Sequence, residues 1–86
     1  MNNLEFVEVF TTNVTSRTDA AMISSLLASL FENSQVTFDL QDVDRVLRIA
    51  SSRPINNEWI VSIVNLFGFK AEVMPDVVSE SVEVNR

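Results

Sequence analysis

Hydrophobic residues along this 86-residue chain recur with two different spacings. In some short runs rich in Val, Ile and Phe every second residue is apolar, which is typical of β-strands. In others the apolar residues are three and four positions apart, which predicts amphipathic helices. Gly68, the only glycine, follows the second helical pattern at the position where a helix commonly ends. The predicted strands are residues 4–11, 36–40, 45–50 and 69–74, and the predicted helices are 19–32 and a segment from Asn56 or Asn57 to Gly68.

The order strand, helix, strand, strand, helix, strand predicts an α+β fold of the ferredoxin-like type. Right-handed crossovers place both helices on one face of a four-stranded antiparallel sheet and make the first and third strands central. One domain is expected over residues 4–75, and a flexible acidic tail is expected over residues 76–86.

Alternation along each strand assigns its side chains to the two faces of the sheet. The face against the helices is expected to carry the sheet's part of the core, namely Val7, Val9, Phe38, Leu47, Ile49, Phe69, Ala71 and Val73. The face that the helices leave open is expected to carry Leu4, Phe6, Phe10, Val46 and Arg48. An apolar patch on an open sheet is more often a protein contact than a bare surface.

The net charge of −6 comes from six Lys and Arg against twelve Asp and Glu. Nucleic-acid phosphates and anionic lipids repel such a domain, so neither nucleic acid nor a membrane is an expected partner. The chain has no Cys, His or Tyr. These absences remove most nucleophiles, most zinc ligands and the usual proton shuttle, so we do not expect an enzyme. With neither a leader-like start nor a long apolar run, the expected location is cytoplasmic.

Two stretches of the chain resemble a known family. The segment 36–40 reads VTFDL and is similar to a Val-x-Val-Asp-Leu strand, and the segment 60–74 reads IVSIVNLFGFKAEVM, a helix closing on Gly followed by an aromatic and then Ala-Glu. From Glu5 to Met74 the chain resembles the heavy-metal-associated domain of copper chaperones and metal-pumping ATPases. The resemblance implies a ferredoxin-like fold.

The loop before the first helix departs from that family. The family's metal loop reads Gly-Met-x-Cys-x-x-Cys, and here Val14 falls at its buried Met while Ser16 and Asp19 fall at its two Cys. Cu(I) is soft and is held by paired thiolates, so we expect no bound metal and no cofactor. Ser16 and Asp19 also suit the start of a helix, as a cap and a first-turn negative charge. A small anion pocket at this helix start is the alternative.

Three acidic residues, Asp39, Asp42 and Asp44, surround the turn between the second and third strands. They are a candidate site for a hard cation such as Ca²⁺. Their spacing does not match a calcium-binding loop, and Asp in a hairpin turn usually bonds the local backbone. We therefore favour the turn interpretation.

A small non-enzymatic module that acts through protein contacts or as a homodimer is the function that the sequence favours. The expected contact surface is the open sheet face with Leu4, Phe6, Phe10, Val46 and Arg48. Stacking of RNA bases on those aromatics is disfavoured by the net charge. Two alternatives remain. One is residual metal handling through Ser16, Asp19 or nearby acidic residues, and the other is a regulatory domain that senses a small molecule.

Overall fold

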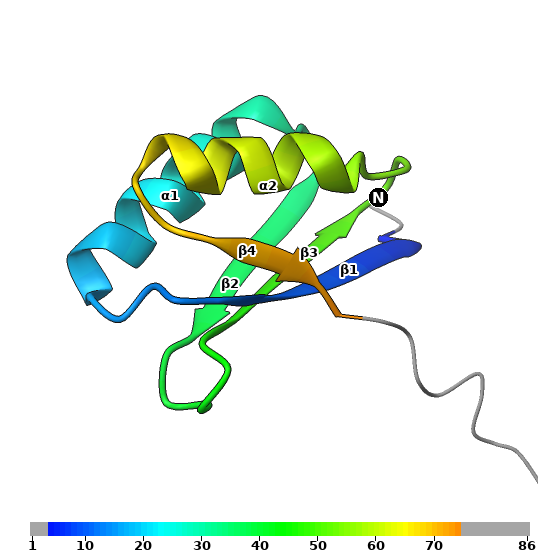
Figure 1. Ribbon diagram of the computed structural model, residues 1–86. Coiled ribbons are helices and arrows are strands. Elements are labelled where there is room, and N and C mark those ends of the chain that lie inside the picture. The colour runs from blue at the N-terminus through cyan, green and yellow to red at the C-terminus, as the bar shows by residue number, and fades with distance from the viewer. Residues whose placement is uncertain (1–3, 75–86) are drawn as a thin grey trace, which may run out of the picture.

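Two helices lie on one face of a four-stranded antiparallel sheet, which confirms the predicted ferredoxin-like α+β class (Figure 1). The computed structural model describes residues 4–74, so the predicted flexible tail lies outside the described residues. The elements in chain order are β1 (Phe6–Thr12), α1 (Arg17–Leu30), β2 (Ser34–Asp39), β3 (Val46–Ser51), α2 (Asn57–Leu66) and β4 (Ala71–Val73). The strand order β2-β3-β1-β4 makes β1 and β3 central, as predicted.

The helix ends follow the capping residues in the sequence. Ser16 precedes α1, and its Oγ accepts a hydrogen bond from the Asp19 backbone N–H at 3.3 Å. Asn56 precedes α2, and its Oδ1 accepts from the Trp59 backbone N–H at 3.2 Å. Gly68 follows α2 with a φ of +91°, the left-handed conformation that glycine adopts without a steric penalty.

The core lies between the helices and the sheet, and each helix contributes three buried side chains to it. Its buried members are Phe10, Val14, Ala20, Ile23, Leu27, Leu47, Ile49, Ile60, Ile63, Val64 and Ala71. Phe38 and Phe69 pack against this cluster and are half-buried, in agreement with their predicted place. Val73 was expected in the core and is exposed, because it ends the short edge strand β4.

The prediction of which side chains of β1 point toward the helices is wrong. Phe10 is fully buried and pairs with Leu47 on the helix side of the sheet. Val7 is 42% exposed, and Val9 pairs with the exposed Arg48 on the open side. Both faces of β1 carry apolar residues, so alternation alone does not decide which face is buried. The larger phenyl ring fills the space under the helices, and the smaller valines take the open face.

Candidate functional site

The loop before α1, which the resemblance aligns with the family's metal loop, is built around the start of this helix. The Ser16 carbonyl accepts from the Ala20 N–H at 2.9 Å, while its Oγ caps Asp19, which confirms the capping interpretation for both residues. Val14 is fully buried beneath this loop. Among residues 4–74, no three His, Cys, Asp or Glu side chains gather closely enough to hold a metal ion.

Hydrogen bonds from two other segments fix the same loop. Thr12 Oγ1 donates to the Arg45 carbonyl at 2.6 Å and accepts from the Val14 N–H at 3.2 Å. Asn13 Oδ1 accepts from the Lys70 N–H at 2.8 Å. The loop is thus tied to the end of the β2–β3 hairpin and to the chain that enters β4, which gives its polar residues a structural role.

The acidic residues of the β2–β3 turn bond their own backbone. Asp39 Oδ1 accepts from the N–H groups of Gln41 and Asp42, at 3.1 and 3.3 Å. Asp42 Oδ1 accepts from the Asp44 N–H at 2.8 Å. These short-range bonds confirm the turn interpretation, since they are the bonds that Asp makes in loops of this kind.

The predicted contact surface does not form a single patch. Val46 and Arg48 lie on the open face of the sheet, as expected. Phe10 lies in the core, and Phe6 shares its face of β1, so neither belongs to the open face. Leu4 is half-buried and lies just before β1.

With this correction, the open sheet face is a mixed surface. Its centre is Arg48, which is exposed and pairs with Val9 on one side and Thr37 on the other. Val7 and Val46 add apolar area toward the ends of their strands. Base stacking needs aromatic rings on the sheet, and β1 and β3 present none on this face.

A larger apolar surface lies on the outer side of the helix layer. Met22 is 51% exposed, Leu30 is 45%, Trp59 is 44% and Leu66 is 81%. The helical spacing of the sequence puts Trp59 on the apolar stripe of α2, which predicts core packing. In the structure Trp59 lies near the surface, with its ring edge-to-face against Phe31 at a centroid distance of 5.2 Å. The apolar stripes of both helices are therefore wider than the sheet can cover.

The exposed side chains follow the seam between α1 and α2. A hollow of about 580 Å³ brings Met22 and Leu26 of α1 together with Phe67, which follows α2. Leu30 lies one turn beyond Leu26, beside the end of the seam where Trp59 contacts Phe31. We call this surface the helix-seam patch, and its members are Met22, Leu26, Leu30, Trp59, Leu66 and Phe67. Leu66 is assigned to it because it lies seven residues after Trp59 and so shares its face of α2.

The helix-seam patch carries almost no charge. Arg17 and Asp19 are the only charged residues of α1, and both lie in its first turn. Glu58 is the only charged residue of α2 and also lies in the first turn. A helix that faces water usually carries charged residues on its outer side. The outer surface of α1 and α2 beyond their first turns is therefore neutral, on a chain of net charge −6.

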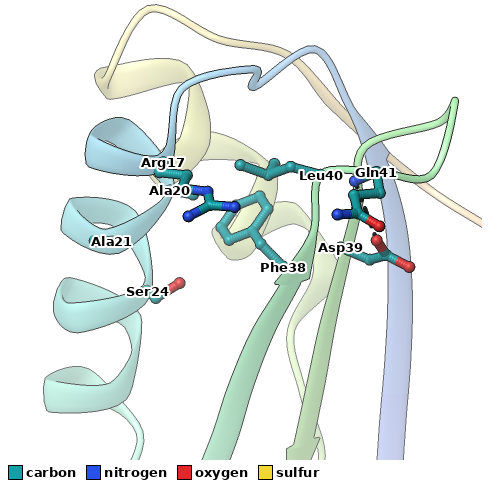
Figure 2. A pocket seen from close by; sticks show the side chains of 8 residues that line it. All are labelled: Arg17, Ala20, Ala21, Ser24, Phe38, Asp39, Leu40 and Gln41. Atoms are coloured by element: carbon teal, nitrogen blue, oxygen red, sulfur yellow. Dashed lines mark hydrogen bonds between the residues drawn. The ribbon is translucent and has the colours of Figure 1, made fainter.

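A second hollow lies between α1 and the edge strand β2 (Figure 2). Its volume is about 450 Å³. The α1 side is lined by Arg17, Ala20, Ala21 and Ser24, and the other side by Phe38, Asp39, Leu40 and Gln41. Figure 2 shows Arg17 and Phe38 facing this space from opposite walls.

Sequence reasoning missed the helix-seam patch, although the chain carries a signal for it. The spacing of three and four residues places Met22, Leu30 and Trp59 on helix stripes, and such stripes are expected to pack on the sheet. The missing charges on the outer positions of α1 and α2 were the available sign that these stripes do more than face the core.

Comparison of the chain with protein-family models, with curated proteins and with solved structures finds no match in any of the three. The resemblance to the heavy-metal-associated family therefore stays a prediction. The structure has the fold class that the resemblance implies, but many unrelated families share this fold. Among the described residues, no helix combines the length and the apolar character that a membrane crossing requires.

Proposed function

We propose that this chain is a non-enzymatic protein-interaction domain that binds a partner protein through the helix-seam patch. The observation that carries the proposal is the exposure of Met22, Leu30, Trp59 and Leu66 on a helix layer without charged residues beyond the first turns. Aromatic and Met side chains are enriched in protein interfaces, and Trp in particular is enriched among the residues that dominate binding energy.

The shape and charge of the patch favour an amphipathic helix as the bound segment. The 14 residues of α1 give the seam a length of about 21 Å, which suits a helix of three to four turns. A helix laid in an apolar groove binds through residues at spacings of three, four and seven. Asp19 lies at one end of the seam, while Arg17 of the same turn faces the hollow beside β2 (Figure 2). Glu32 and Glu58 lie at the other end. We therefore expect Lys or Arg beside the apolar stripe of the partner helix.

A titration followed by NMR tests this proposal. The labelled chain is titrated with a synthetic amphipathic peptide that carries a Leu stripe and flanking Lys residues, and separately with a peptide of the same composition in scrambled order. We expect shift changes at the helix-seam patch with the first peptide only. Equal changes with both peptides, or changes confined to the open sheet face, would contradict the proposal.

A further inference from the structure

The two edges of the sheet differ in how they are protected from pairing with another strand. At one edge, β4 has 3 residues with the charged Glu72 at its centre. At the other edge, β2 has 6 residues with the sequence SQVTFD and pairs only with β3 in the described part of the chain. Natural edge strands are usually blocked by Lys, Pro, bulges or short length. The strand β2 contains neither Lys nor Pro, and its register with β3 is continuous from Ser34 to Asp39.

The sequence of β2 is complementary to itself when a second copy runs antiparallel and Thr37 faces Thr37. On the helix side of the sheet, Val36 then lies opposite Phe38 in both directions, an aromatic and β-branched pair. On the open side, Gln35 lies opposite Asp39, so that an amide donor meets a carboxylate acceptor. Each residue from 35 to 39 gains a partner of suitable size and polarity in this register.

Charge favours the same register. Asp39 is the only charged residue of β2. With Thr37 at the centre, the two copies of Asp39 lie about 13 Å apart along the strands, more than one Debye length at physiological salt. A register centred on Asp39 would place the two carboxylates directly opposite each other, which destabilises a sheet.

The hollow beside β2 leaves room for the side chains of the second strand. Phe38 and Leu40 line this hollow on the helix side, opposite Ala20 and Ala21 of α1. In the Thr37 register, Val36 of the second copy lies against Phe38 at this hollow. An apolar side chain therefore meets the apolar part of this lining, which is Ala20, Ala21, Phe38 and Leu40, while Arg17 and Ser24 make the rest of the α1 wall polar.

We propose that two copies of this chain pair β2 with β2, antiparallel and with the twofold axis at Thr37, to form one continuous sheet. This contact is separate from the helix-seam patch, because it uses the backbone edge of β2 and leaves the outer side of both helices uncovered. An interface of two strands is small, so the dimer forms in a concentration-dependent equilibrium.

Charge pairing at position 37 tests the proposal, because a twofold axis brings that residue opposite its own copy. We expect Thr37→Lys and Thr37→Glu each to weaken self-association by about fivefold or more in sedimentation equilibrium, since like charges oppose each other. An equimolar mixture of the two variants is expected to recover at least the wild-type affinity. Val43→Lys, at an exposed hairpin residue, adds the same charge away from β2 and is expected to leave the affinity unchanged.

The outcomes separate this proposal from the one for the helix-seam patch. Recovery in the mixture, with concentration-dependent amide protection at residues 35–39 in hydrogen exchange, supports the β2 dimer. A monomer up to millimolar concentration, or equal weakening by the single variants and the mixture, overturns it. Dimers that persist in Thr37→Lys but dissociate in Leu66→Glu also overturn it and assign self-association to the helix layer. Circular dichroism confirms that each variant is folded.

Discussion

Asn13 and Lys70 are 57 residues apart in sequence and are joined by two hydrogen bonds. One joins the two backbones, and the other joins the Lys70 backbone to the Asn13 side chain. The Lys70 N–H donates to Asn13 Oδ1 at 2.8 Å, and the Asn13 N–H donates to the Lys70 carbonyl at 3.3 Å. This pair joins the loop before α1 to the chain that enters β4. It holds in place the loop that contains Val14 and Ser16.

Removal of the Asn13 side chain tests the strength of this connection. We expect Asn13→Ala to lower the free energy of unfolding by about 1 kcal/mol, since it removes one hydrogen bond and leaves the Lys70 N–H without that partner. Urea denaturation followed by circular dichroism measures the change. Gln41→Ala, at an exposed residue of the β2–β3 turn, is the control and is expected to change stability little. Equal midpoints for the wild type and Asn13→Ala would contradict the structural role.

The helix start at Ser16 supports a second prediction. Ser16→Ala removes the oxygen that accepts from the Asp19 N–H, so a loss of about 1 kcal/mol in unfolding free energy is expected. Ser16→Asp supplies another good cap and is expected to retain most of the stability. Thr15→Ala, at the exposed neighbouring position, is the control. If Ser16→Ala and Thr15→Ala have the same effect, Ser16 does not act as the cap.

Metal binding gives a third prediction, through a gain of function. We expect calorimetry with Cu(I) or Zn²⁺ to show no 1:1 binding at micromolar concentration, because the loop lacks thiolates. The double variant Ser16→Cys and Asp19→Cys introduces the Cys-x-x-Cys spacing of the resembled family and is expected to bind Cu(I) at 1:1. Tight binding by the wild type would support the alternative function of residual metal handling. No binding by the double variant would count against the resemblance in this loop.

The facing of β1 gives a fourth prediction. Phe10 is fully buried, so Phe10→Ala is expected to cost about 3–5 kcal/mol of unfolding free energy. Val7 is exposed on the other face, so Val7→Ala is expected to cost less than about 1 kcal/mol. Urea denaturation of both variants checks the difference. A larger loss for Val7→Ala than for Phe10→Ala would restore the opposite facing of this strand.

The order of helices and strands could be predicted from the sequence, because the spacing of apolar residues and the residues that begin or end each element indicate the same boundaries. Residues that cap or terminate a helix act locally, so Asn56 and Gly68 mark the limits of α2 without knowledge of the rest of the fold. The facing of β1 could not be predicted, because it depends on the pairing of Phe10 with Leu47. That pairing joins distant segments, so the alternation of apolar and polar residues within β1 does not reveal it.

The candidate site was harder to predict than the fold. A wide apolar stripe such as that of α1 is compatible with two arrangements. The helix can pack on the sheet alone, or it can pack on the sheet with one part of the stripe and on a partner with the other. Only the exposure of Met22 and Leu66 in the folded chain separates the two cases. The sequence placed the contact on the open sheet face, and the structure leaves more apolar area on the helix layer.

The affinity of the chain for the synthetic basic amphipathic helix tests the central claim most directly when it is compared across three proteins. Leu66→Glu places a charge in the helix-seam patch, and Val43→Glu places the same charge on an equally exposed hairpin residue. We predict that calorimetry gives at least tenfold weaker binding for Leu66→Glu and an affinity close to wild type for Val43→Glu. Equal affinities for all three proteins would contradict the assignment of the helix-seam patch as the binding surface.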